Sequence, residues 1–227
     1  MRTRSIALAL LLAAIAVPAL TQTPTPRPRL TAAHIPNLDT VKDEIRFYYT
    51  SGDWNREVEG VAAQAEAYVD ARVAQHPVRP AIVLDIDDTA LSDYAYEAGH
   101  DFGYDSHSYN LLVIAEAFPA IAPTLALAKH AKADGVAVFF ITGRRTPLRS
   151  VTLGNLLKVG FPQPDGLFLR PPSDHARSII PFKSSVRAHI QALGYTVLLS
   201  MGDQWSDLRG GHAERDFKLP NPMYFIP

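Results

Sequence analysis

The sequence predicts an α/β protein in which a doubly wound, mostly parallel sheet follows an N-terminal helical pair and carries a small cap or none. From Pro80 onward, short apolar runs alternate with longer amphipathic stretches, which is typical of a parallel sheet covered by helices. Gly135, Gly160 and Gly194 each stand just beyond a predicted helix, where a left-handed residue is favoured. The expected strands span residues 81–84, 136–141, 166–169 and 197–200, and the expected helices span 109–118, 123–134, 147–159 and 183–193.

The segment before the sheet has the spacing of two amphipathic helices. Between residues 39 and 74, apolar side chains such as Val41 and Ile45 recur at helical intervals. The pattern is interrupted over residues 51–53, a Ser-Gly-Asp sequence that favours a turn. We therefore expect a pair of helices beside or over the functional end of the sheet.

Residues 1–19 have the pattern of an export signal peptide. Two arginines precede an apolar run over residues 6–17, and the small residues that follow predict cleavage after Ala19. The run is shorter than the roughly 20 residues that cross a bilayer comfortably, which disfavours the alternative of an uncleaved anchor. A Pro-rich linker is expected over residues 20–29, and the folded domain over residues 30–227.

The composition excludes several classes of function. The 227-residue chain has a formal net charge of only -1, so its overall charge does not favour nucleic acid or an anionic membrane as a partner. It has no cysteine, which rules out disulfides, thiolate metal sites, a cysteine nucleophile and a lipid-modified N-terminal cysteine. The sequence also lacks the motifs of HExxH metalloproteases, GxSxG hydrolases, dinucleotide-binding folds and P-loop NTPases.

Polar residues follow three of the predicted strands at the point where each strand ends. They are Asp85 and Asp87 after the first strand, Thr142, Gly143 and Arg144 after the second, and Gly202 and Asp203 after the last. Because open parallel sheets bind ligands beyond the carboxyl ends of their strands, these residues are expected to converge on one site. Lys183 begins a predicted helix and is expected at the same edge.

The two aspartates after the first strand suit phosphoryl transfer. Asp85 is predicted to be the nucleophile, because a carboxylate in this position can attack phosphorus and form an aspartyl-phosphate. Asp87 is predicted to be the general acid and base, which protonates the leaving alcohol and later activates water. Thr89 is expected to orient Asp87 through a hydrogen bond, and Asp88 to cap the backbone just beyond the strand.

A carboxylate nucleophile and a phosphate dianion repel each other, so the site needs positive charge. One Mg²⁺ ion suits the oxygen ligands present, which are the carboxylates of Asp85 and Asp203 and the backbone carbonyl of Asp87. Lys183 is expected to place an ammonium group on the phosphoryl oxygens. Further hydrogen bonds to the phosphate are expected from Thr142, Gly143 and Arg144.

Each of these segments has an ordinary structural interpretation when it is taken alone. Paired aspartates after a strand are common in turns and helix caps, Thr142-Gly143 is a turn signal, and a lysine at a helix start is usually solvated. Gly202-Asp203, with Asp207 four residues further on, also fits a tight turn and a cap. The functional interpretation is preferred because all four segments occur in order, each at a predicted strand end or helix start.

These motifs resemble those of a known family. The sequences VLDIDDT at 83–89, FITGR at 140–144 and GDQWSD at 202–207, together with Lys183, are similar to the haloacid dehalogenase superfamily of phosphotransferases. Within that superfamily, residues 39–227 resemble the class B acid phosphatase group, which includes bacterial secreted acid phosphatases and plant vegetative storage proteins.

The resemblance implies a Rossmann-like core and a role for each matching residue. It implies the nucleophile at Asp85, the acid and base at Asp87, a supporting acid at Asp207, metal ligands at Asp85, Asp87 and Asp203, and phosphate contacts at Thr142, Gly143 and Lys183. It also implies an acidic pH optimum and a periplasmic or secreted location. Some bacterial relatives are lipoproteins, which the lack of cysteine excludes here, and some plant storage relatives lack the nucleophile that Asp85 supplies.

The superfamily controls substrate choice with an insertion or cap, and only residues 92–118 lie in the corresponding place. A large cap does not fit in this length, so an open pocket with broad specificity for small organic monophosphates, nucleotides among them, is expected. Tyr94, Tyr96, Phe102 and Tyr104 lie in the segment. Two interpretations stay open for these rings: stacking on a nucleobase or aryl group, or packing within the protein.

The predicted function is therefore hydrolysis of small phosphate monoesters by an exported, magnesium-dependent acid phosphatase. Three alternatives remain. One is a phosphotransferase that passes the phosphoryl group to another alcohol, and the second is a catalytically weak phosphate-binding or storage protein. The third is a receiver-type signalling domain phosphorylated on Asp85, which the export signal disfavours. The expected partners exclude nucleic acid and a stable membrane anchor, and the oligomeric state stays open.

Overall fold

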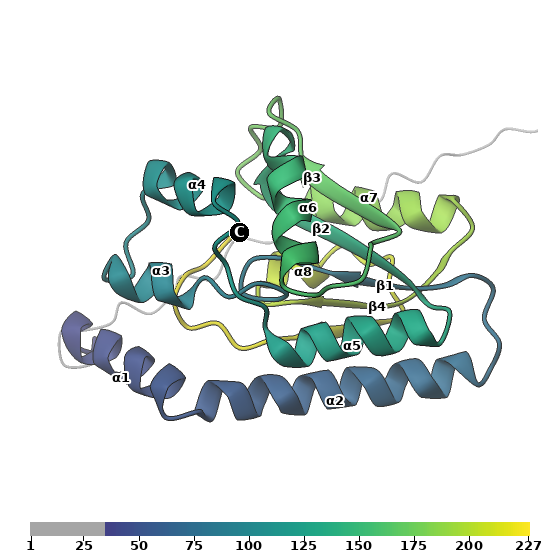
Figure 1. Cartoon of the computed structure of the whole chain (residues 1–227), viewed down its shortest axis with the longest axis horizontal. Coiled ribbons are helices and arrows are strands. Elements are labelled where there is room, and N and C mark those ends of the chain that lie inside the picture. Colours follow the sequence, from purple (N-terminus) through teal and green to yellow (C-terminus); the bar gives the residue numbers. More distant parts are fainter. Residues whose placement is uncertain (1–34) are drawn as a thin grey trace, which may run out of the picture. The chain divides into compact units, whose positions relative to one another are not determined.

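Five parallel strands form the central sheet (Figure 1). Their spatial order is β3-β2-β1-β4-β5, so the sheet extends in both directions from β1, as in a doubly wound fold. The predicted fold class is confirmed. Every strand pair is parallel, whereas the sequence predicted a mostly parallel sheet. The strands are β1 (Pro80–Leu84), β2 (Ala137–Arg145), β3 (Gly166–Arg170), β4 (Thr196–Gly202) and β5 (Arg215–Lys218).

The computed structural model describes residues 35–227, so the predicted signal peptide (1–19) and linker (20–29) lie outside the described residues. No helix within residues 35–227 combines the length and the apolar character needed to cross a membrane. The helices are α1 (Leu38–Thr50), α2 (Asp53–Val73), α3 (Tyr94–Gly99), α4 (Ser106–Ile114), α5 (Ala122–Ala133), α6 (Arg149–Lys158), α7 (Ile180–Ala192) and α8 (Trp205–Leu208).

Helices cover both faces of the sheet, because successive side chains of a strand point to opposite sides. Ile82 and Leu84 of β1 belong to the larger core, which also contains Val58 of α2 and Leu127 of α5. Ala81 and Val83 belong to a second core with α7 on the other face. Figure 1 shows α2 and α5 running side by side along one face. Burial on both faces explains why the strands appear in the sequence as continuous apolar runs.

The two N-terminal helices contact different parts of the protein: α2 contacts the sheet, and α1 contacts residues 92–118, called the cap segment below. Whereas α2 packs against α5 and the sheet, α1 lies beside α3. Tyr49 of α1 stacks on Tyr94 of α3 with ring centroids 4.2 Å apart. The guanidinium of Arg46 donates to Asp101, just beyond α3, at 2.7 Å. The first helix therefore supports the cap segment from outside.

The sequence prediction misses strand β5, helix α3 and the four-residue helix α8. Strand β5 (Arg215–Lys218) has only Phe217 buried, so it lacks the apolar run that identified the other strands. Helix α3 (Tyr94–Gly99) has six residues and no side-chain cap, which is too short for helical periodicity to be visible. The positive φ angles of Gly135, Gly160 and Gly194 confirm the predicted left-handed helix ends.

A charged contact on the surface joins α2 to α5. His130 Nε2 lies 2.6 Å from Asp70 Oδ1 and 3.4 Å from Asp134 Oδ2. The hydrogen bond to Asp70 raises the pKa of His130 above its ordinary value, with burial opposing and the charges of Asp70, Glu66 and Asp134 adding to the rise. A histidine whose pKa is raised by folding stabilises the folded state fully at pH values below its pKa in the unfolded chain. This contribution is lost as the pH rises through its pKa in the folded protein.

We expect His130→Gln to destabilise the protein at pH 6 and to have little effect at pH 8.5. Urea unfolding of both proteins at the two pH values measures the difference in free energy. In an Asp70→Asn background, the pH dependence of the His130→Gln effect should shrink, because the main partner is gone. An effect of equal size at both pH values would contradict the assignment.

Candidate active site

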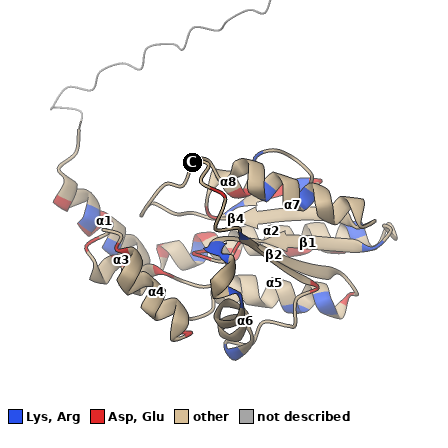
Figure 2. Ribbon diagram, turned by 90° about the horizontal axis from the view of Figure 1, so that it is seen from above, with Lys and Arg blue, Asp and Glu red and all other residues tan. Residues whose placement is uncertain are grey.

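The predicted site residues converge at the carboxyl end of the sheet. Asp85 follows β1, Thr142 lies near the end of β2, and Gly202 is the last residue of β4. Strands β2 and β4 flank β1 in the sheet. Lys183 lies in the first turn of α7. Figure 2 shows acidic and basic residues gathered at the end of the sheet next to α3 and α4.

A buried ion-pair cluster lies at the centre of this site. Lys183 Nζ lies 2.5 Å from Asp85 Oδ1 and also donates to Asp207 Oδ1. Lys183 is only 5% exposed, so both contacts form away from bulk water. The predicted proximity of Lys183 and Asp85 is thus found, and Asp207, predicted as a supporting acid, holds the ammonium from the other side.

The segment after β4 is built around Asp207. Its Oδ2 accepts a hydrogen bond from the Gln204 backbone amide at 2.8 Å, which completes a capping box at the start of α8. Gly202 is required beneath it, because a Cβ at this position would overlap with the Asp207 side chain. Arg187, fully buried one turn beyond Lys183 on α7, donates from Nη1 to the Asp207 carbonyl at 2.5 Å. Helix α7 therefore fixes both the side chain and the backbone of Asp207.

Asp203 is held by three neutral donors. Its Oδ1 accepts a hydrogen bond from the Thr89 hydroxyl at 3.1 Å. Its Oδ2 accepts hydrogen bonds from the side-chain amides of Gln204 and Asn221, each at 2.7 Å. The expectation that Thr89 orients Asp87 is wrong, because Thr89 Oγ1 also accepts from the Asp203 backbone amide at 3.0 Å. Thr89 instead fastens the end of β1 to the end of β4.

The electrostatics of this cluster favour an additional cation. Burial raises the pKa of the Asp203 carboxyl to about 6, and the charge of Asp207 adds to the effect. Burial, followed by the charge of Asp207, also raises the pKa of Asp85 well above its ordinary value, although Lys183 opposes the shift. Burial alone would lower the pKa of Lys183, but the charges of Asp207 and Asp85 outweigh it. The carboxylates are thus short of positive charge.

The residues present fit a divalent metal ion. Carboxylate oxygens of Asp85, Asp203 and Asp207 lie within 4.8 Å of one another, and all three residues are buried. When ionised, they carry three negative charges against the one positive charge of Lys183, so a divalent cation would balance the cluster. Oxygen ligands of this kind suit a hard cation such as Mg²⁺. Both oxygens of Asp207 are engaged, Oδ1 by Lys183 and Oδ2 by the Gln204 backbone amide. Within residues 35–227, Lys183 engages only Oδ1 of Asp85, and Asp203 accepts only from neutral donors. Asp85 and Asp203 are therefore the carboxylates that would hold the ion.

Asp87 has a separate set of partners. Its Oδ1 accepts from the Tyr109 hydroxyl at 2.9 Å and from Arg144 Nε at 2.8 Å, and Arg144 Nη2 lies 2.6 Å away as an ion pair. Arg144 was expected to grip the phosphate in a bidentate manner. In the structure, Nε and Nη2 face Asp87 and the side chain is buried, while Nη1 has no hydrogen-bond partner within residues 35–227. The contact of Arg144 with phosphate stays a prediction.

The two other predicted phosphate ligands differ in exposure. Thr142 is buried, and its hydroxyl accepts from the Arg144 amide at 3.1 Å and lies 3.4 Å from Asp87 Oδ2. The pairing of β2 with β3 shifts register between Thr142 and Arg145, and Gly143 in the shift is exposed. The Gly143 backbone is therefore open to a ligand at the sheet edge, as a phosphate contact requires.

Asp88 has the structural role that was predicted for it. It adopts a positive φ of 53°, and its Oδ1 accepts from the Asp93 amide at 2.9 Å. Its Oδ2 accepts from the Tyr224 hydroxyl at 2.9 Å, which ties the C-terminal segment to the loop after β1. The closing segment 218–224 resembles that of the acid phosphatase group, but sequence analysis assigned no role in the site to its Asn221 and Tyr224, nor to Tyr109, because each reaches the site from a distant segment.

The aromatic residues of the cap segment are mostly packing residues. Tyr94 stacks on Tyr49, and Tyr96 is buried with its hydroxyl donating to the Asp105 carbonyl at 2.9 Å. Phe102 packs against the core with Arg46 over its ring. Tyr104 differs, because 67% of it is exposed. The packing interpretation therefore holds for the first three rings.

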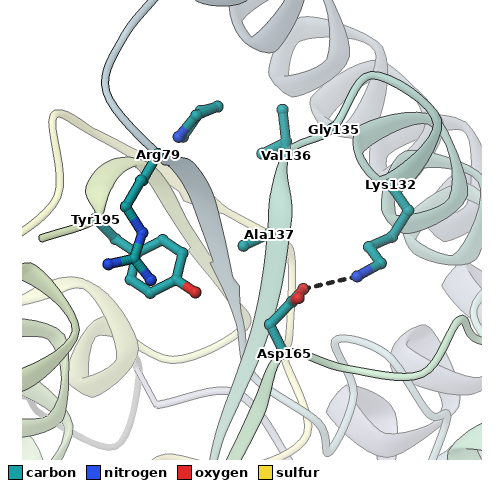
Figure 3. Close-up of a pocket in the computed structure, with 8 residues that line it drawn as sticks. Arg79, Lys132, Gly135, Val136, Ala137, Asp165 and Tyr195 are labelled. Atoms are coloured by element: carbon teal, nitrogen blue, oxygen red, sulfur yellow. Dashed lines mark hydrogen bonds and ion pairs between the residues drawn. The ribbon is translucent and has the colours of Figure 1, made fainter. Parts of the chain in front are cut away.

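A pocket of about 270 Å³ lies at the opposite end of the sheet, where β1, β2 and β4 begin (Figure 3). Its charged side chains have partners within the protein. Lys132 Nζ donates to Asp165 Oδ2 at 2.8 Å, and the Arg79 guanidinium lies 4.0 Å from the centre of the Tyr195 ring. None of the predicted site residues lines this pocket.

Comparison with known proteins gives a consistent picture. The model of a family described as "HAD superfamily, subfamily IIIB (Acid phosphatase)" matches residues 21–227. Acid phosphatase 1 of Solanum lycopersicum is 33% identical over 188 residues, which cover 81% of this chain and 74% of that protein. Vegetative storage protein 1 of Arabidopsis thaliana is 29% identical over 204 residues, covering 86% and 75% respectively.

A solved structure supports the fold. The class C acid phosphatase from Bacillus anthracis superposes with a TM-score of 0.69 and covers 83% of this chain and 86% of its own. Its sequence identity to this chain is 22%, so the likeness extends to the arrangement of the sheet and helices.

We expect Gly202→Ala to lower kcat/KM by more than about 10-fold, because the added methyl group displaces Asp207 and with it Lys183. The overlap should also destabilise the fold by about 1–3 kcal/mol. Phosphatase assays and thermal unfolding measure the two effects.

Gly60→Ala is the matched control. Gly60 lies in the middle of α2, and a Cβ there meets nothing within 4 Å. This change should stabilise the helix by about 0.5–1 kcal/mol and leave activity unaltered. Full activity in Gly202→Ala would show that Asp207 need not lie where the structure places it.

Proposed function

Because the chain belongs to the acid phosphatases of HAD subfamily IIIB, we propose that it hydrolyses small phosphate monoesters through an aspartyl-phosphate on Asp85, with one Mg²⁺ ion as cofactor. Phosphomonoesterase activity follows from membership in the family. The observation that carries the mechanism is the buried contact of Asp85 with Lys183. Asp85 belongs to a cluster of carboxylates and precedes Asp87 by two residues in the sequence.

In the first step, an oxygen of Asp85 bonds to phosphorus while the bond to the leaving oxygen breaks. Lys183 holds Asp85 Oδ1 at 2.5 Å, which leaves Oδ2 for the attack. Asp87 gives its proton to the leaving alcohol. In the second step, water attacks the aspartyl-phosphate, Asp87 takes a proton from that water, and Asp85 is released with inorganic phosphate.

Charge is the main obstacle in both steps, because the nucleophile and the phosphate are both anionic. The ammonium of Lys183 offsets part of this repulsion, and the Gly143 backbone amide and the Thr142 hydroxyl add neutral donors for the phosphoryl oxygens. Mg²⁺ bound by the Asp85 and Asp203 carboxylates and the Asp87 carbonyl would offset the remainder.

The site favours an enzyme over a storage protein. One relative is named an acid phosphatase and another a vegetative storage protein, so similarity alone fits both roles. In this chain the nucleophile, the acid and base, the ammonium group and the carboxylates for the metal are all present together. The signal-like pattern of residues 1–19 supports export to the periplasm or medium.

We expect Asp85→Asn to lower kcat for 4-nitrophenyl phosphate by at least about 10³-fold, because an amide cannot form the covalent intermediate. Asp216→Asn, on the exposed edge strand β5, should retain activity and serves as the control. Brief incubation of the parent enzyme with labelled substrate, followed by acid quenching, should leave label on Asp85. An asparagine variant as active as its parent would exclude this mechanism.

We also expect removal of divalent metal to abolish activity. Dialysis against EDTA should reduce turnover by at least about 10²-fold, since the charge on the carboxylates is then uncompensated. Adding Mg²⁺ back should restore it, whereas Na⁺ at the same ionic strength should not. Unchanged turnover in EDTA would mean that Lys183 alone suffices.

A further inference from the structure

The two carboxylate oxygens of Asp87 differ in their contacts. Oδ1 has three neighbours, which are the Tyr109 hydroxyl at 2.9 Å, Arg144 Nε at 2.8 Å and Arg144 Nη2 at 2.6 Å. Oδ2 has one weak contact, with the Thr142 hydroxyl at 3.4 Å. The Tyr109 hydroxyl and Arg144 Nε donate hydrogen bonds to Oδ1, and Arg144 Nη2 is an ion-pair contact, so both lone pairs of Oδ1 are occupied and none is free to carry a proton. The proton that Asp87 transfers must therefore reside on Oδ2.

Tyr109 is itself held firmly. It is 8% exposed, and its ring packs between Tyr96 and Phe118, at centroid distances of 5.1 and 5.3 Å. Its hydroxyl also lies 2.6 Å from Asp93 Oδ2. Asp93 is buried and its amide donates to Asp88, so it is anchored to the same loop as Asp87.

A tyrosine hydroxyl has one proton to donate, so Tyr109 donates to Asp87 Oδ1 when Asp93 is protonated and donates to the Tyr109 oxygen. Burial, followed by the charges of Asp87 and Asp88, raises the pKa of Asp93 well above its ordinary value, which favours this arrangement. The hydroxyl thus has a fixed position between two carboxyl groups.

We propose that Tyr109, supported by Asp93, is a positioning residue that occupies Oδ1 of Asp87 and so directs the proton-carrying Oδ2 toward the leaving oxygen of the substrate. This inference rests on the proposed role of Asp87 as general acid. Tyr109 does not touch the reacting atoms and acts through Asp87.

This role makes a prediction about leaving groups. An alkyl phosphate needs the proton from Asp87, because an alkoxide is a poor leaving group, whereas 4-nitrophenolate departs readily without one. Loss of the Tyr109 hydroxyl should therefore slow the alkyl substrate more than the nitrophenyl substrate. A general loss of folding or of metal binding would slow both equally.

The experiment compares kcat/KM for 4-nitrophenyl phosphate and glycerol phosphate in the parent and in Tyr109→Phe, both with Mg²⁺. kcat/KM reports the first chemical step, so hydrolysis of the intermediate does not mask the effect. We expect a loss of about 10-fold with glycerol phosphate and less than about 3-fold with 4-nitrophenyl phosphate, a fraction of the ~10² to 10⁴ that general acid catalysis supplies. KM should change little.

Tyr96→Phe is the matched control, because it removes another buried tyrosine hydroxyl from the same segment. That hydroxyl donates to the Asp105 carbonyl and has no contact with Asp87. The ratio of the two kcat/KM values should equal that of the parent. Equal losses on both substrates in Tyr109→Phe, no loss at all, or the same bias in Tyr96→Phe would overturn the proposal.

Asp93→Leu gives a second test if Tyr109→Phe does not fold. It keeps the branched shape of the side chain and removes the hydrogen bond that holds the Tyr109 hydroxyl, so it should show the same bias between substrates. An unbiased ratio in a folded Asp93→Leu protein would overturn the proposal. If the parent enzyme with Mg²⁺ hydrolyses neither substrate, the proposed function fails with it. If the parent hydrolyses both and the ratio is unchanged in the variants, only the role of Tyr109 fails.

Discussion

The contact of Lys183 with Asp85 and Asp207, buried at the end of the sheet, is the interaction on which the rest of the site depends. Removing one partner of a buried ion pair typically costs about 3–5 kcal/mol, because the other charge is left uncompensated. Loss of the ammonium would therefore disfavour the ionised form of Asp85. The same pairing fixes the direction of Asp85, the proposed nucleophile.

The remaining elements fix the positions of these three groups. Helix α7 brings Lys183 to the end of β1, and Arg187, one turn later, holds the backbone around Asp207. Thr89 and Asp203 join the ends of β1 and β4, so the two carboxylates that suit a metal ion are set by adjacent strands. A separate network of Arg144 and the cap segment holds Asp87. Asp85 and Asp87, the proposed nucleophile and acid, lie two residues apart but are positioned by different parts of the protein.

Sequence analysis found the features that depend on local pattern. Asp85, Thr142 and Asp203 follow strands whose apolar runs are visible in the sequence, and parallel topology then requires them to converge. It failed where a contact depends on which segments become neighbours. Thr89 bonds to Asp203 because β4 lies next to β1, and Arg144 turns to Asp87 because a buried guanidinium needs a counter-charge. The contact of Tyr109 with Asp87 requires the fold of residues 92–118, in which a helix was expected only over 109–118 and α3 was missed.

The central proposal is that the buried carboxylates bind one divalent cation. Thermal unfolding of the mature protein in increasing Mg²⁺, with Na⁺ at matched ionic strength as reference, tests it without relying on catalysis. A ligand that binds only the folded state raises the unfolding temperature as its concentration increases. The account predicts such a rise in the parent and its loss in Asp203→Asn. An unfolding temperature that does not depend on Mg²⁺, or an equal rise in both proteins, would contradict it.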